Sequence, residues 1–409
     1  MIAGIEKGLG AIFIFFLIGI LVAALMEAGT IGALIYYGLD TLHPSLFLPA
    51  GLLLCSLMSL ATGTAWGTIA TLGVVLIGLG QTLGMSPALV AGMVVSGASF
   101  GDKMSPVSDT TNLAAMSGNT DLYSHIKSMM YSTVPTYLIC ILIFTIIGFY
   151  FTTSAISDQE MFRLRELLGI EFLISPLTLL PLLVLLFLSI NRTPAEASML
   201  ASVAAAVVLA VLIQERSLVD ILNSLHTGYE SNTGDQKLDS LLTRGGITSM
   251  MWTMSLALIA LSLGGILDRA GFVQVLLRGI LERIQRAASL MTATIAAGIV
   301  GNMSMGEGYL SIIFGGQIFK ESYEKNGLEN HMLSRCLEEG ATLSTSLIPW
   351  TTSGAFITGV LSISPLEFAP WTFFNYLNPL FSIGLAYLGF GIFRKVSKTH
   401  EADHLKSYT

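Results

Sequence analysis

Long stretches without Asp, Glu, Lys or Arg are the most regular feature of the chain. They cover residues 8–26, 44–101, 128–157, 172–191, 197–214, 245–267, 287–306, 340–366 and 368–393. A helix needs about 20 apolar residues to cross the hydrocarbon core of a bilayer. Each stretch is therefore long enough for a span, and 44–101 must hold more than one. The pattern predicts an all-α polytopic membrane protein with about ten transmembrane segments.

Charged connectors separate these stretches at 158–171, 215–244, 268–286 and 320–339. The connector 268–286 places Arg278, Glu282, Arg283 and Arg286 among apolar residues, a pattern typical of an amphipathic helix in the membrane interface. Its arginines and the basic tail 394–409 predict that both face the cytoplasm. We expect 215–244 to be a polar, mobile loop.

The chain also repeats itself. Gly97-Ala98-Ser99, then Pro106 and Ser108, match Gly340-Ala341-Thr342, then Pro349 and Thr351, at an offset of 340 − 97 = 243. Leu25, Ala28 and Gly29 match Leu267, Ala270 and Gly271 at 267 − 25 = 242. Duplicated halves with Gly/Pro-interrupted hydrophobic segments are a transporter signature.

The duplication predicts two repeats, inverted relative to each other. We expect a first repeat at 1–157, a connector at 158–171, a second repeat at 172–393 and the cytoplasmic tail. Segments 172–191 and 197–214 open the second repeat without a counterpart before the first. We therefore expect the first repeat to lack an N-terminal pair of helices.

Composition narrows the class of protein. The 409 residues are 53% hydrophobic and 11% charged, whereas soluble domains carry about 25% charged residues. This excludes a soluble enzyme, a disulfide scaffold and a disordered chain. The net charge of −7 without a basic face predicts no nucleic-acid partner. The sequence contains no P-loop, H-E-x-x-H or G-x-S-x-G motif, so we expect no enzyme and no cofactor.

Four polar interruptions break the apolar pattern, at 61–68, 97–112, 301–308 and 340–354. Irregular backbone at membrane depth is tolerated only where it is buried in protein or lines a cavity. Backbone carbonyls and Ser, Thr or Asn oxygens are ligands for a hard cation such as Na+. The candidates of this kind are Thr62, Thr64, Ser105, Thr110, Thr111, Asn112, Thr342, Ser344, Thr345, Thr351 and Thr352. Alternatively, such hydroxyls bond their own backbone or join helices.

The carboxylates within the interruptions indicate a functional site more specifically than the hydroxyl groups do. Asp102, Asp109 and Glu307 lie in otherwise uncharged surroundings, and an ionisable residue inside a span indicates a functional site. Desolvation raises the pKa of a buried carboxyl group and a bound cation lowers it. One group can thus hold Na+ or H+ in turn, which predicts ion exchange at Asp109 and Asp102. Lys103 is either an ion-pair partner of Asp102 or an anion-binding residue, and we expect Glu338 and Glu339 to be entrance or loop charges.

Several of these segments resemble the NhaC family of Na+/H+ antiporters. The likeness is carried by 101–113 (Gly-Asp-Lys-Met-Ser-Pro-Val-Ser-Asp-Thr-Thr-Asn-Leu), 121–126, 134–135, 59–64, 333–340, 348–351 and 374–379. It covers essentially the whole chain and marks Asp102, Ser105, Asp109, Thr110, Thr111 and Asn112 as core-motif positions. Glu307 and Thr352 depart from the family pattern, which has Asp and often Asn there.

The resemblance implies an ion-transporter fold of inverted repeats with broken helices or hairpins, and a homodimer. We predict an antiporter of the bacterial cytoplasmic membrane that moves Na+, or Li+, against H+. The alternative is a Na+/H+-coupled antiporter of malate, lactate or similar small carboxylic acids, with Lys103 as the charge that binds the acid. A channel and, more weakly, a membrane enzyme are the remaining alternatives.

Overall fold

The computed structural model describes residues 2–7, 9–41, 44–151, 158–191, 193–271 and 286–395. Helices make up most of this part of the chain, which contains no named strand and only the isolated bridges Tyr229–Arg244 and Leu328–Arg394. The prediction of an all-α protein is confirmed.

The elements of the first half and its connector are α1 (Ile2–Lys7), α2 (Leu9–Glu27), α3 (Thr30–Thr41), η1 (Pro44–Leu46), α4 (Phe47–Thr62), α5 (Ala65–Thr68), the π-helical turn η2 (Ile69–Gly73), α6 (Val74–Thr82), α7 (Pro87–Met104), α8 (Asp109–Gly118), α9 (Leu122–Phe151) and α10 (Asp158–Glu171). The predicted stretch 44–101 thus holds three successive segments.

The elements of the second half are η4 (Pro176–Leu179), α11 (Leu180–Ile190), α12 (Ala195–Leu212), α13 (Leu218–Thr227), α14 (Gln236–Leu242), η5 (Ile247–Met250), α15 (Met251–Arg269), α17 (Ala287–Met305), α18 (Gly308–Lys325), α19 (Asn330–Leu337), the π-helical turn η6 (Glu338–Thr342), α20 (Leu343–Thr345), α21 (Thr352–Leu361), α22 (Pro365–Phe368), η7 (Ala369–Trp371) and α23 (Phe373–Tyr387). The connector 215–244, expected to be a loop, contains α13 and α14, and Ser217 caps the start of α13.

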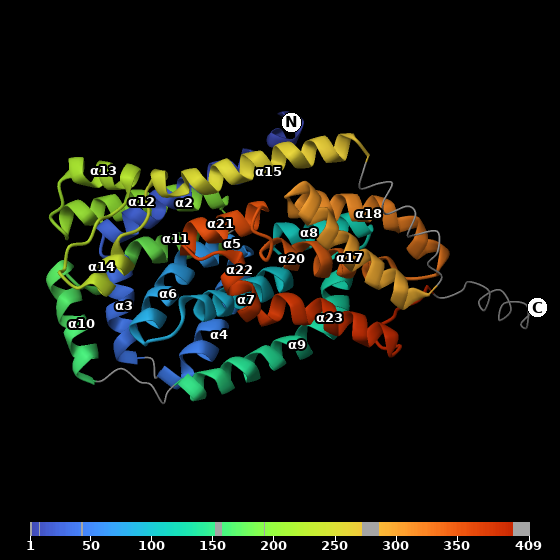
Figure 1. The fold of residues 1–409 in the computed structure, drawn as a ribbon, viewed down its shortest axis with the longest axis horizontal. Coiled ribbons are helices and arrows are strands. Elements are labelled where there is room, and N and C mark those ends of the chain that lie inside the picture. The colour runs from blue at the N-terminus through green and yellow to red at the C-terminus, as the bar shows by residue number, and fades with distance from the viewer. Residues whose placement is uncertain are drawn as a thin grey trace, which may run out of the picture.

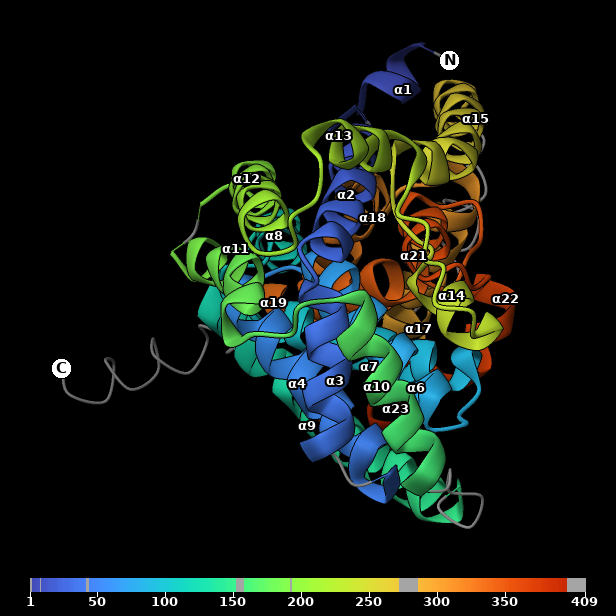
Figure 2. The ribbon, with the colours of Figure 1, turned by 90° about the vertical axis from the view of Figure 1, so that its left-hand side faces the viewer.

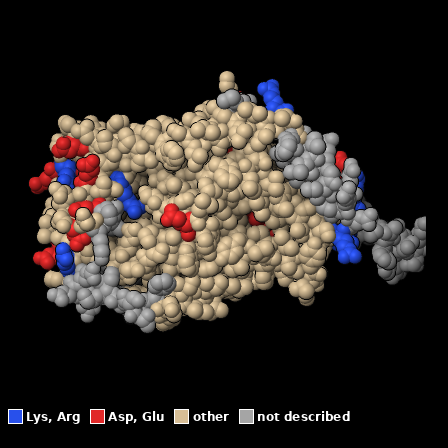
Figure 3. Space-filling view, in the orientation of Figure 1, with Lys and Arg blue, Asp and Glu red and all other residues tan. Residues whose placement is uncertain are grey.

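Five helices of the described chain are long and apolar enough to cross a membrane, and seven if each of two bent helix pairs is one span. Charged side chains gather at the two ends of the long axis and are sparse across the wide middle (Figure 3). The protein is therefore a multi-pass membrane protein, while the count of about ten spans stays a prediction. The amphipathic helix expected at 268–286 and the tail lie largely outside the described residues.

The long helices form the outside of the molecule around the broken ones. In Figure 1, α15 runs along one edge and α9 along the opposite edge, with the short helices α5, α8, α20 and α21 between them. Figure 2 shows α12 beside α2 on one flank, with α11 packed against α12. Most of the broken elements are thus enclosed by helices, which is what interrupted backbone requires in a bilayer.

Small residues bring α7 directly against α4. A Cβ atom on Gly97 would lie 2.6 Å from the Leu52 carbonyl oxygen, and one on Gly101 would overlap the carbonyl oxygen of Ser56. Ser59 strengthens the contact, because its hydroxyl donates to the Ala98 carbonyl at 2.7 Å. This close approach positions the C-terminal end of α7, which carries Asp102.

The same local features recur 243 residues apart. Gly63 ends α4 with φ 71° and Gly306 ends α17 with φ 72° (306 − 63 = 243). Asn119 ends α8 with φ 56° and Ser362 ends α21 with φ 58° (362 − 119 = 243). The two halves that are similar in sequence therefore also end their helices at equivalent positions.

A buried charge cluster joins the two halves next to the broken segments. Lys103 Nζ lies 3.6 Å from Glu339 Oε1 and donates to Asn378 Oδ1 at 2.5 Å. Arg335 Nε lies 3.9 Å from the same Glu339 oxygen, which also accepts from Ser132. Lys103, Arg335 and Glu339 are all essentially inaccessible to solvent, so the Glu339 carboxylate is shared between two buried basic side chains.

The sequence-based expectation for the two glutamates was wrong. Glu338 and Glu339 are buried in η6 rather than placed at an entrance or in a loop. Lys103 pairs with Glu339 in the other half, a partner that spacing along the chain does not reveal.

We expect Gly101→Ala to destabilise the protein. The added methyl group has no room against α4, and overpacking of this kind typically costs about 1–3 kcal/mol. The matched control is Gly169→Ala in α10, where a Cβ atom meets nothing within 4 Å. Thermal unfolding in detergent should show a lower Tm for Gly101→Ala only, and equal Tm values would refute close α4–α7 packing.

We expect Lys103→Met to be more damaging still. Removing one partner of a buried ion pair typically costs about 3–5 kcal/mol. Here it takes away the nearer cation of Glu339, leaving only Arg335 beside it, and it leaves the buried amide oxygen of Asn378 without its donor. Lys325→Met is the control, because it breaks an exposed pair with Glu321 in which the side chains are 78% and 82% accessible. A Tm for Lys103→Met as high as that of the control would show that the buried cluster is not ionised as described.

Candidate functional site

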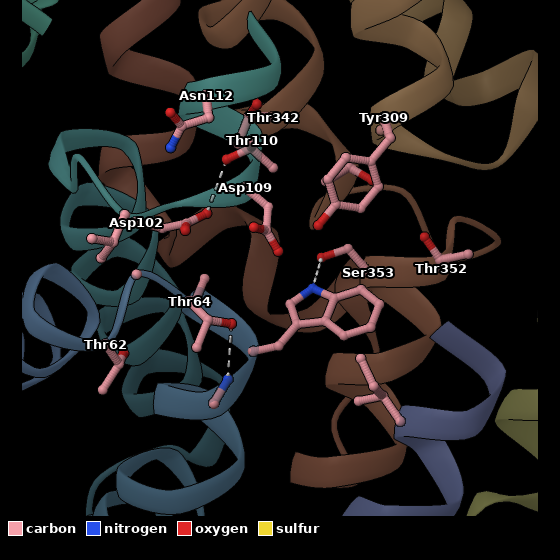
Figure 4. A pocket seen from close by; sticks show the side chains of 18 of the residues that line it. Thr62, Thr64, Asp102, Asp109, Thr110, Asn112, Tyr309, Thr342, Thr352 and Ser353 are labelled. Atoms are coloured by element: carbon pink, nitrogen blue, oxygen red, sulfur yellow. Dashed lines mark hydrogen bonds between the residues drawn. The ribbon is translucent and has the colours of Figure 1, made fainter. Parts of the chain in front are cut away.

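All four interruptions meet at one cavity of about 850 Å³. The predicted site residues that line it are Thr62, Thr64, Asp102, Asp109, Thr110, Asn112, Glu307, Thr342, Thr345 and Thr352. Figure 4 labels most of these side chains, and they come from both halves of the chain. Segments separated by more than 200 residues in sequence therefore share a single site.

The first interruption is a sharp turn between α4 and α5. Gly63 adopts a left-handed conformation and packs against Val107 of the second interruption. Thr64 then caps α5 by accepting from the Gly67 amide at 3.4 Å. The hydroxyl oxygen of Thr62 is buried and has no hydrogen-bond partner in the described part of the chain, so it is available to a ligand.

The second interruption separates α7 from α8 and supplies two carboxylates at different depths. Asp102 is 8% accessible, and its Oδ2 accepts from the Thr110 hydroxyl at 3.4 Å. Asp109 is the first residue of α8, lines the same cavity and is exposed to solvent. Thr110 also lies 3.3 Å from Glu338 Oε1, so a single hydroxyl proton serves two carboxylates.

The third interruption repeats the turn of the first with a carboxylate in place of a hydroxyl. Glu307 corresponds to Thr64 at the same offset (307 − 64 = 243) and caps α18. Its Oε2 accepts from the amides of Tyr309 at 2.7 Å and Leu310 at 3.2 Å. Its Oε1 accepts from the Thr352 hydroxyl at 3.3 Å, which links it to the fourth interruption.

The fourth interruption passes through η6 and α20 before α21 begins. Thr351 caps α21 by accepting from the Gly354 amide at 3.0 Å. Thr342 and Thr345 line the cavity, and within the described chain the buried Thr345 hydroxyl has no hydrogen-bond partner. Thr62 and Thr345 thus offer unused oxygens from opposite halves.

Five candidates lie outside the lining of the cavity. Ser105 donates to the Leu60 carbonyl at 2.8 Å, Thr111 to the carbonyls of Asp102 and Lys103 at 3.2 Å, and Ser344 to the Gly340 carbonyl at 2.6 Å. Thr351 serves as the cap of α21 and Lys103 belongs to the charge cluster. These contacts hold the interrupted backbone in shape.

Several lining residues were not among the sequence candidates. Glu196 comes from the first turn of α12 and Tyr309 is the second residue of α18, while Trp66 and Ser353 come from the interruptions themselves. The Trp66 indole nitrogen donates to the Ser353 hydroxyl at 3.3 Å and so connects the two halves. No repeat or motif points to Glu196, because only the packing of α12 beside α2 brings it to the cavity.

The charge of the cavity has one sign. Its acidic lining residues are Asp102, Asp109, Glu196 and Glu307. None of the lining residues is Lys, Arg or His. Among the described residues, no three His, Cys, Asp or Glu side chains are close enough together to hold a metal ion. A cation here would be held by one or two carboxylates and by neutral oxygens, which suits a monovalent ion.

Known proteins resemble the chain over nearly its whole length. The Na+/H+ antiporter family matches residues 1–109 and 97–390. The Na+/H+ antiporter NhaC of Alkalihalophilus pseudofirmus is 37% identical, with 97% of this chain and 86% of the relative covered. NhaC of Bacillus subtilis is 35% identical over 95% of this chain and 86% of the relative. The malate-2H+/Na+-lactate antiporter of Bacillus subtilis is 31% identical over 99% and 86%. These matches show that the chain belongs to the Na+/H+ antiporter family.

Proposed function

We propose that this protein exchanges Na+ for H+ across the cytoplasmic membrane of a bacterium, and that it does so at the cavity between the four interruptions. One observation supports this site above all. Every interruption contributes oxygen-bearing side chains to one cavity, which is lined by acidic but not by basic residues. Carboxylate, hydroxyl and carbonyl oxygens suit a hard cation. Li+, which is chemically similar, is a second candidate cation.

Competition between Na+ and H+ for the same carboxylates provides the exchange. Asp102 and Asp109 are the groups that we assign to alternate between the two ions. Glu307 has both oxygens engaged by α18 and Thr352, so it serves better as a fixed negative charge. Access to the two sides would alternate as one group of helices moves against the other, with 1–157 and 172–393 as the two repeats.

Exchange of malate or lactate is a second candidate, because one relative is named for it. The cavity supports it less. Arginine is the usual bidentate partner of a carboxylate, yet no basic side chain lines the cavity. Lys103, the base expected for this role, is engaged by Glu339 and Asn378.

We expect Asp109→Asn to abolish Na+-dependent proton movement without unfolding the protein, because an amide keeps the size of the side chain but cannot ionise. The matched control is Asp121→Asn, an exposed residue that caps α9 by accepting from the Ser124 amide at 2.9 Å. Purified variants in liposomes with an internal pH dye provide the assay, with Tm as the check on folding. Normal exchange by Asp109→Asn would refute its role.

The same liposomes separate the two candidate substrates. We expect NaCl alone to dissipate an imposed pH gradient, with an apparent KM for Na+ that rises as pH falls because protons compete for the site. Potassium chloride serves as the control. Proton movement only after malate and lactate are supplied on opposite sides would instead assign the protein to organic-acid exchange.

A further inference from the structure

The cavity is larger than a dehydrated Na+ ion requires. Its volume of about 850 Å³ falls in the range of small-molecule pockets, roughly 300–1,000 Å³. A Na+ ion needs only a small cage of oxygens, such as Asp102 with its neighbouring hydroxyls. The lining also includes Asp109, Glu196 and Tyr309, which are accessible to solvent and leave room for a larger ligand.

Two aromatic rings form part of the wall of this space. Trp66 and Tyr309 line the cavity together with the carboxylates, and Figure 4 shows the Tyr309 hydroxyl directed toward Ser353 and Asp109. The Trp66 ring is fixed in place by stacking on Phe356 with ring centroids 4.5 Å apart and by its bond to Ser353. Aromatic rings beside carboxylates are features that bind organic cations.

The helices that restart after the interruptions begin at the cavity with a side chain on their first amides. The start of α12, which also lies at the cavity, has no side-chain cap but carries Glu196 in its first turn, and this negative charge disfavours an anion. A helix N-terminus can hold a substrate carboxylate through its free amides. Here Glu307 occupies the first amides of α18, Ser108 accepts from Thr111 in α8, and Thr351 caps α21. An organic substrate would therefore be recognised by its positive group and not by a carboxylate.

We infer that the cavity also accepts a small organic monocation with N–H donors, of the guanidinium or primary ammonium class, and exchanges it for protons. This inference rests on the proposed function, because the same carboxylates bind the cation. The N–H groups would donate to Asp102 or Asp109, and the planar or apolar part would lie against Tyr309. No covalent step is involved, since one cation enters as one proton leaves.

Guanidinium is the probe of choice, because its pKa above about 12 keeps it charged and prevents it from carrying protons as a neutral base. We expect millimolar guanidinium chloride outside liposomes to drive saturable proton movement and to raise the apparent KM for Na+. Tetramethylammonium is the matched control, with the same charge but no N–H donor, and should do neither. Asp102→Asn should lose the responses to both Na+ and guanidinium.

A pair of variants tests the aromatic wall. Loss of a cation–π contact predicts that Tyr309→Leu raises the ratio of the guanidinium KM to the Na+ KM roughly twofold to thirtyfold. Tyr309→Phe keeps the ring and should leave that ratio unchanged. A ratio that moves equally in both variants would assign the effect to the hydroxyl and contradict the role of the ring.

The outcomes separate this inference from the proposed function. Exchange driven by NaCl, with guanidinium neither driving nor competing, overturns the inference and leaves Na+/H+ exchange intact. Exchange driven by guanidinium alone supports the inference and refutes Na+ as substrate. If neither cation moves protons, both are wrong.

Discussion

Interrupted helices in a bilayer must have their free backbone groups satisfied by protein or by a water-lined cavity. This constraint explains why the four interruptions of the chain are together. Each helix that restarts beside the cavity is capped by a side chain: Thr64, Ser108, Glu307 or Thr351. The backbone N–H and C=O groups that lose their helical partners at the interruptions thus lie close to the acidic side chains. The hydrogen-bonding needs of these groups therefore bring together the polar residues of the proposed ion site.

The two halves use one backbone plan with different chemistry. Equivalent positions 243 residues apart hold Thr64 and Glu307, Asp102 and Thr345, and Asp109 and Thr352. A carboxylate in one half therefore corresponds to a hydroxyl in the other. As a consequence, both halves contribute acidic residues to the cavity. In none of these three pairs, however, are both equivalent positions acidic.

The sequence allowed the fold class, the interruptions and the three central carboxylates to be predicted, because uncharged stretches and isolated acids are local features. Ten of the hydroxyl, amide and carboxyl candidates do line the cavity. Glu196 and the pairing of Lys103 with Glu339 could not be predicted, since both arise from contacts between distant helices. The burial of Glu338 was missed for the same reason, because its hydrogen-bond partner Thr110 lies in α8, 228 residues away.

The central claim is that Na+ and H+ compete for the same carboxylates. The most direct test is proton release from the purified protein in weakly buffered detergent when NaCl is added, with choline chloride as the control for ionic strength. The account predicts that Na+ releases protons in a saturable manner and that choline releases none. Saturable binding of Na+ without any release of protons would contradict it.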